Sequence, residues 1–118
     1  MHASETWQLR YYQTLGSGMP FREWQASLTD SRVAAAVEVR LDRLRQGLFG
    51  DCKPVGEGVL EIRIDLGPGY RGYFVRSGRR VILLLCGGDK RTQSSDIEKA
   101  KKYGRDYEQR IRAAVRSG

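Results

Sequence analysis

Residues 58–93 read GVLEIRIDLGPGYRGYFVRSGRRVILLLCGGDKRTQ, and this stretch decides the fold. Residues 60–66 alternate apolar and charged side chains, which predicts a strand with one buried and one solvated face. Pro68-Gly69 predicts a turn before a second strand over 70–76, and Ser77-Gly78 predicts a tight return. Five unbroken apolar residues, 81–85, predict a central third strand that is covered on both faces. We therefore expect a meander of three antiparallel strands.

The flanking segments predict one strand and three helices. Residues 6–14 are rich in aromatic and β-prone side chains and are expected to form a first strand that joins the sheet. Residues 20–28 predict a short helix, and a second helix is expected to begin at residues 29–31 with an apolar stripe that ends at Leu48. Residues 51–58 are expected to form a loop, and a last helix should run from Ser94 or Ser95 to about Ala114. The predicted fold class is α+β: a small antiparallel sheet with helices packed on one face.

The size and the cysteine content limit the possible classes. A chain of 118 residues supports one domain, 1–118. Two cysteines are too few for a disulfide framework, and Cys86 ends a buried strand, so we expect it to act as a small core residue. His2 is the single histidine and lies near a terminus, so zinc sites and histidine-based catalysis are not expected. There is no membrane-length apolar run and no secretion signal, so a cytoplasmic protein is expected.

The positive charge is concentrated in the second half of the chain. Residues 1–58 carry seven basic and seven acidic side chains, whereas residues 59–118 carry fourteen basic and seven acidic ones. This surplus accounts for the formal net charge of +7. A localised basic field favours a polyanionic partner, such as nucleic acid or an acidic protein, although many soluble domains are basic without such a function.

A set of cations is expected on the solvated side of the sheet. Arg63 and Arg71 lie on strands, and Lys90 and Arg91 follow the third strand in a loop. Guanidinium groups held on strands suit a phosphodiester because their planar fork matches two phosphate oxygens. Tyr73 is expected on the face of Arg71, exposed and able to stack on an unpaired base.

The alternative for this set is an ordinary solvated surface. Arg63 has acidic neighbours two residues away on either side, Glu61 and Asp65, and can be paired with them along the strand. Lys90 and Arg91 can equally be a charged loop with no ligand.

The chain also resembles a known family of bacterial toxins. The segments that carry the resemblance are RLDRLRQGLFGDCKPVGEGVLEIRIDLGPGYRGYF and LLLCGGDKRTQSSDIEKAKK, within residues 21 to about 102. They are similar to the RelE/ParE superfamily of toxin–antitoxin modules, and within it to the HigB-like addiction module killer proteins. The resemblance implies a small sheet with two N-terminal helices on one side. It also implies cleavage of messenger RNA, commonly on the ribosome, by attack of the ribose 2′-hydroxyl on the adjacent phosphate, with no metal or other cofactor.

The resemblance assigns roles to particular residues. Arg71 matches the arginine of the family's GYR segment, Arg63 a basic strand position, and Lys90 and Arg91 the basic loop after the last strand. The expected catalytic residues are therefore Arg63, Arg71 and Lys90, and the expected RNA-binding residues are Arg91, Tyr73 and Lys53. Two features depart from the family: Glu61 stands where RelE-type enzymes place a strand lysine, and no tyrosine or histidine lies near residues 96–97. Glu61, Asp89 and Lys90 remain candidates for proton transfer.

The sequence hypothesis is thus a HigB/RelE-like toxin that cuts translated mRNA. Its expected partners are a cognate antitoxin, with which it forms a hetero-oligomer, together with mRNA and the ribosome; no membrane partner is expected. Because the catalytic set is incomplete, two alternatives stay open: a ParE-like inhibitor of DNA gyrase without nuclease activity, and a non-enzymatic RNA-binding module.

Overall fold

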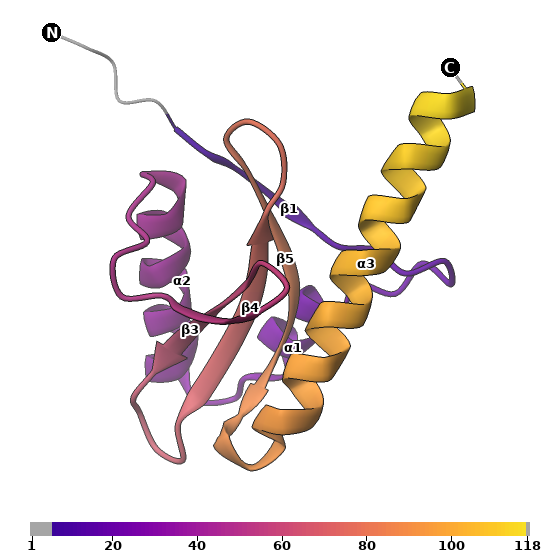
Figure 1. Ribbon diagram of the computed structural model, residues 1–118. Coiled ribbons are helices and arrows are strands. Elements are labelled where there is room, and N and C mark those ends of the chain that lie inside the picture. Colours follow the sequence, from indigo (N-terminus) through magenta and orange to yellow (C-terminus); the bar gives the residue numbers. More distant parts are fainter. Residues whose placement is uncertain (1–5, 118) are drawn as a thin grey trace, which may run out of the picture.

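The computed structural model describes residues 6–117, and a five-stranded sheet lies at its centre (Figure 1). The strands, in the spatial order β1-β5-β4-β3-β2, are β1 (Gln8–Tyr11), β5 (Val81–Asp89), β4 (Tyr70–Arg76), β3 (Val59–Ile64) and β2 (Lys53–Gly56). The strands β3, β4 and β5 are consecutive antiparallel neighbours. The predicted meander and the predicted α+β fold class are therefore confirmed.

The first strand is shorter than expected, and it runs parallel to its neighbour rather than antiparallel. It pairs with β5 in parallel, with Gln8 opposite Val81, so the sheet is mixed rather than wholly antiparallel. The next helix, α1 (Pro20–Ser27), explains this direction, because its Trp24 ring lies against Gly87 near the end of β5. A chain that runs along β5 in the same sense arrives at that end, where α1 begins to pack.

Part of the expected loop over 51–58 is instead the edge strand β2. Lys53 pairs with Glu61 and Pro54 with Leu60, and the register then shifts before Gly56. Proline and glycine favour the loop prediction, but an edge strand tolerates proline because one side of its backbone needs no partner. This strand places Lys53 beside the centre of β3.

The two N-terminal helices cover one face of the sheet. The second helix, α2 (Ser31–Arg45), starts at Asp30, whose side chain accepts a hydrogen bond from the Arg32 backbone N–H, as the predicted cap requires. Buried residues from both helices pack on the even-numbered residues of β3, β4 and β5; this cluster includes Phe21, Val33, Val37, Leu41, Leu44, Ile62, Phe74, Ile82 and Leu84. Leu48, which we expected on the α2 stripe, is 53% exposed because the helix ends at Arg45.

The C-terminal helix α3 (Gln93–Ser117) covers the opposite face, so the helices do not all pack on one side (Figure 1). It follows a short 3₁₀ turn, Lys90–Thr92. The residues beneath it are apolar and would otherwise be exposed; they include Val59, Tyr73, Leu83, Leu85 and Cys86. Burial raises the pKa of the Cys86 thiol to about 12, which agrees with its predicted role as a core residue. The face expected to be solvated is therefore largely buried.

Candidate nucleic-acid interface

Four of the six candidate side chains lie in two adjacent rows across the sheet. In one row Lys53, Glu61 and Tyr73 are cross-strand partners on β2, β3 and β4. In the next row Arg63 on β3 lies opposite Arg71 on β4. Residues directly opposite one another, and residues two apart on one strand, share a face. Strand register thus gathers Lys53, Tyr73 and the two arginines around Glu61, on the face that α3 covers.

Glu61 is the centre of this cluster and is fully buried. Its Oε1 accepts a hydrogen bond from Arg63 Nε at 2.9 Å. Its Oε2 accepts from the Tyr73 hydroxyl at 3.1 Å and from Gln93 Nε2 at 2.9 Å. Burial alone would raise the pKa of the Glu61 carboxyl, but these hydrogen bonds outweigh it and hold that pKa below its usual range. Glu61 is therefore an ionised carboxylate fixed between two arginines.

Arg71 carries hydrogen-bonding capacity that the described residues leave unused. The residue is 9% exposed, and its Nε and Nη1 atoms are buried with no hydrogen-bond partner within residues 6–117. Its Nε lies 3.8 Å from Glu61 Oε2, close enough for an ion pair but too long for a hydrogen bond. Buried donors in folded proteins are almost always paired, so two buried guanidinium nitrogens without a hydrogen-bond partner are an unusual feature that calls for a functional explanation. The expected position of Arg71 on a solvated face is wrong, because α3 covers that face.

A second buried carboxylate lies beside Arg71 on the β5 side. The strand partner of Arg71 is Gly88, and Asp96 of α3 lies so close over it that a Cβ at Gly88 would be 1.9 Å from Asp96 Oδ2. Asp96 is 6% exposed and accepts a hydrogen bond from Thr92 Oγ1 at 2.5 Å. The glycine therefore lets the start of α3 approach the sheet next to the strand partner of Arg71.

Arg63 is the more accessible of the two arginines. Its side chain is 41% exposed, and its Nε is engaged by Glu61, so the expected pairing along the strand is confirmed for Glu61. The remaining face of the guanidinium is open to solvent. Two arginines opposite each other on neighbouring strands would repel. Glu61 offsets this repulsion and holds both in one place.

Lys90 and Arg91 lie at the same end of the sheet but are exposed. The Lys90 backbone N–H donates to the Gly69 carbonyl at 3.1 Å. A Cβ at Gly69 would lie 3.9 Å from Lys90 Cβ and 3.7 Å from Arg71 Nη1, so the turn before β4 lies between the base of the Lys90 side chain and the Arg71 guanidinium. Arg91 is turned to solvent and is paired with Asp89 at 2.9 Å. The hydrogen bond from Arg91 lowers the pKa of Asp89, which makes that carboxylate a weaker base.

The expected stacking surface on Tyr73 is wrong. Its side chain has no exposed area, since it lies under α3 with its hydroxyl bound to Glu61. Burial, together with the Glu61 charge, raises the pKa of the Tyr73 hydroxyl, so it remains a hydrogen-bond donor. A ring with no exposed surface cannot stack on a base, and Tyr73 instead helps to position Glu61.

Two members of the cluster, Gln93 and Asp96, were not predicted from the sequence. Both come from the first turn of α3, and no local pattern indicates which strand that turn will meet. The one available signal was the Gly87-Gly88 pair, because consecutive glycines in a buried strand indicate close approach of other groups on both faces.

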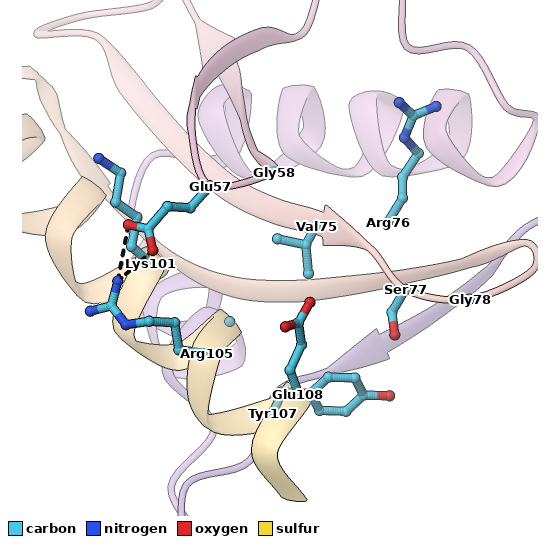
Figure 2. Close-up of a pocket in the computed structure, with 11 residues that line it drawn as sticks. Glu57, Gly58, Val75, Arg76, Ser77, Gly78, Lys101, Arg105, Tyr107 and Glu108 are labelled. Carbon is cyan, nitrogen blue, oxygen red and sulfur yellow. Dashed lines mark hydrogen bonds and ion pairs between the residues drawn. The ribbon is translucent and has the colours of Figure 1, made fainter. Parts of the chain in front are cut away.

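A groove of about 290 Å³ lies farther along α3 and contains none of the six candidate residues (Figure 2). Figure 2 shows the ion pair between Arg105 Nη1 and Glu57 Oε1, at 2.7 Å, which ties the β2–β3 turn to the helix. Between residues 6 and 117 the structure contains no group of three or more His, Cys, Asp or Glu side chains that could hold a metal ion. No helix in that part of the chain is both long and apolar enough to cross a lipid bilayer.

Comparison with known proteins places this arrangement in a family. The family described as "Phage derived protein Gp49-like (DUF891)" matches residues 21–108, from α1 well into α3. The chain belongs to this family. The Gp49-like proteins are a toxin-like family of toxin–antitoxin modules. An uncharacterized protein of Haemophilus influenzae is 45% identical to the chain over 83 residues, which is 70% of this chain and 84% of the relative. No solved structure matches the chain.

Proposed function

We propose that this Gp49-like protein is a HigB/RelE-like toxin of a type II toxin–antitoxin module, and that it cleaves translated messenger RNA. The observation that carries the proposal is the pair of opposed arginines on β3 and β4: Arg63 is half-exposed, and Arg71 has two buried nitrogens that make no hydrogen bond within residues 6–117. A guanidinium stays charged, and its planar fork matches two phosphate oxygens. The proposed partners are ribosome-bound mRNA and a cognate antitoxin, and the proposed compartment is the cytoplasm.

The proposed reaction uses the RNA's own nucleophile. The ribose 2′-hydroxyl attacks the adjacent phosphorus, so the O2′–P bond forms as the P–O5′ bond breaks. The products are a 2′,3′-cyclic phosphate and a 5′-hydroxyl, and a proton must leave O2′ and reach O5′. Negative charge increases on the non-bridging oxygens in the transition state, and Arg71 and Arg63 stabilise it. Removing one such preorganised donor typically lowers the rate about 10²–10³-fold.

Among the candidates for proton transfer, Lys90 suits the role better than the two carboxylates. Glu61 has no exposed surface, and its oxygens already accept three hydrogen bonds. Asp89 is held by Arg91. Lys90 is exposed and adjoins the turn beside Arg71, so its ammonium can approach the leaving oxygen. The proposal therefore gives Lys90 the role of proton donor to O5′, while water takes the proton from O2′ and later returns one to Lys90; Arg91 and Lys53 contact the RNA backbone.

The test is to induce the protein in growing bacteria and follow two readouts over time. A nuclease cuts transcripts early, while DNA supercoiling stays normal. Arg71→Ala should abolish both transcript cleavage and growth arrest, whereas Arg79→Ala, in the exposed β4–β5 turn, should retain them. Intact transcripts in cells arrested by the wild-type protein would refute the nuclease proposal.

The second candidate is a ParE-like inhibitor of DNA gyrase that carries out no catalysis. Its support is that Glu61 already neutralises part of the charge on Arg63 and Arg71, and that both candidate carboxylate bases are engaged. The same induction experiment separates the two, since gyrase inhibition gives broken DNA and altered supercoiling before any loss of transcripts. A non-enzymatic RNA-binding module would instead show salt-sensitive RNA binding without growth arrest.

A further inference from the structure

The final turns of α3 extend past the sheet and carry an uncovered apolar stripe. Earlier in the helix Ala100, Tyr103 and Tyr107 pack on the sheet. The same stripe continues as Ile111 and Val115, which are 42% and 75% exposed. Figure 1 shows this end of α3, in yellow, projecting beyond the strands. The helix therefore continues its core-facing pattern where residues 6–117 cover Ile111 only in part and leave most of Val115 exposed.

A groove adjoins the stripe on the side of β1. It has a volume of about 270 Å³, and its apolar lining includes Leu83, Tyr107 and Ile111. Arg10 and Arg110 also line it; no carboxylate among residues 6–117 does, although Arg110 is paired with Asp106 at 2.7 Å. Tyr107 lines both this groove and the one in Figure 2, so the helix separates two hollows at the point where it leaves the sheet. An apolar floor with cations beside it suits an amphipathic segment that carries acidic side chains.

The direction in which the helix projects is set by contacts with the segment after β1. The Tyr12 hydroxyl donates to Asp106 Oδ2 at 2.6 Å, and the Tyr12 ring stacks on Tyr103 with centroids 4.8 Å apart. Arg110 Nη2 donates to the Gln13 carbonyl at 2.6 Å, and its guanidinium lies 5.2 Å from the centre of the Tyr12 ring. The helix is thus held rigidly just before its uncovered end, so the docking surface is formed in advance.

The charge of the distal helix identifies the kind of occupant. Residues 108–117 contain three arginines and a single glutamate, Glu108. Arg110 lies 2.7 Å from Asp106 and Arg112 lies 3.7 Å from Glu108, so the segment keeps a small positive excess. That excess disfavours a second copy as the occupant. An acidic helix would instead meet complementary charge around the apolar stripe.

We propose that the distal end of α3 and the groove beside β1 form the docking surface for an acidic, amphipathic helix of the antitoxin. The proposal rests on the toxin assignment above and names the surface that the partner uses. The surface lies at the opposite end of α3 from Gln93, which contacts Glu61. Docking can therefore be impaired without touching the cluster around Arg71.

The test compares two double variants against the purified product of the reading frame next to the toxin gene. In one variant Ile111→Glu and Val115→Glu place negative charge on the stripe. In the matched control Val39→Glu and Leu48→Glu change two other exposed apolar residues, each 53% exposed, away from α3. Calorimetric titration should give the control the wild-type affinity. The stripe variant should bind at least about 100-fold more weakly, and the neighbouring gene should no longer rescue its growth arrest.

Three results would overturn the docking proposal. The stripe variant could bind as tightly as wild type, or the neighbouring product could fail to bind the wild-type protein at all. Sedimentation could also show that the wild type is a dimer which the stripe variant splits, in which case the surface serves a second copy. The proposed function is tested separately, by growth and transcript assays of the same variants without the partner. Both variants keep Arg63 and Arg71, so both should still cleave transcripts and arrest growth.

Discussion

Replacing Glu61 with glutamine tests whether this carboxylate holds the arginine cluster together. Glutamine has nearly the same shape but no charge, and its amide NH₂ would face donors that now meet a carboxylate oxygen. Arg71, 9% exposed, would lose its nearest counter-charge. The substitution therefore leaves a buried cation only partly compensated.

The expected loss can be worked from the contacts. Removing one partner of a buried ion pair typically costs about 3–5 kcal/mol. Two features favour the lower end of this range of free energy. Arg63 is 41% exposed and can be hydrated, and Asp96 remains close to Gly88, the strand partner of Arg71. An unfolding entropy of about 2.1 cal/mol/K per residue converts a loss of about 3 kcal/mol into a fall in Tm of about 12 °C for 118 residues.

The assay is thermal unfolding of wild type and Glu61→Gln, followed by circular dichroism across a range of pH. The folded-state pKa of Glu61 is lowered, so its contribution is fully present above the unfolded carboxyl pKa of about 4.3. That contribution is lost as the pH falls through the folded value. The gap in Tm between the two proteins should therefore be wide at neutral pH and close progressively below about pH 4.

The matched control is Glu98→Gln on the exposed side of α3, where the carboxylate is 73% exposed and 3.8 Å from Lys101. Its Tm should stay within about 2 °C of wild type, since exposed pairs contribute little. An unchanged Tm for Glu61→Gln at neutral pH would show that the Glu61 carboxylate does not hold the arginine cluster together. A gap that persists unchanged in acid would show that the lost contacts do not depend on the charge of Glu61.

Three further substitutions test the packing of the sheet and of α3 against it. Leu84→Ala removes a fully buried side chain from the interior strand β5 and should cost about 2–5 kcal/mol in urea unfolding; a near-neutral result would contradict a close-packed core at β5. Tyr12→Phe removes the hydrogen bond to Asp106 and should lower stability by about 1–2 kcal/mol, with faster amide exchange in α3 as the specific sign. Gly88→Ala would place a Cβ 1.9 Å from Asp96 Oδ2 and should cost about 1–3 kcal/mol, so a variant with wild-type stability would argue against the close approach of α3.

Local patterns in the sequence predicted the meander but not everything that surrounds it. Alternation over residues 60–66 and the Pro68-Gly69 turn act over a few residues, so they specify β3 and β4 directly. The parallel sense of β1 depends on where α1 docks on β5, about 70 residues away in sequence, and no short pattern carries that information. Strand β2 could not be predicted either, because its proline and its glycine are equally typical of a loop.

The sequence predicted that Arg63 and Arg71 lie together on the sheet, but it did not predict the residues that surround them. Placing Arg63 and Arg71 on neighbouring strands of one sheet was enough to bring them together. The burial of Arg71 was not predicted, because it depends on α3 crossing that face. The unbroken apolar run 81–85 did predict a strand covered on both faces, which conflicts with helices on one side only; α3 provides the second cover.

The most direct test of the proposed role of Arg71 measures mRNA cleavage on purified translating ribosomes by wild type, Arg71→Lys and Arg79→Lys. Lysine keeps the charge of Arg71 but removes the planar fork, while Arg79 lies in the exposed β4–β5 turn and serves as the control. If Arg71 binds the scissile phosphate, the wild type should leave 2′,3′-cyclic phosphate ends and Arg79→Lys should cleave at the same rate. A folded Arg71→Lys should cleave at least about 100-fold more slowly. Cleavage by Arg71→Lys at the wild-type rate would contradict the claim that this buried guanidinium binds the phosphate while the bond breaks.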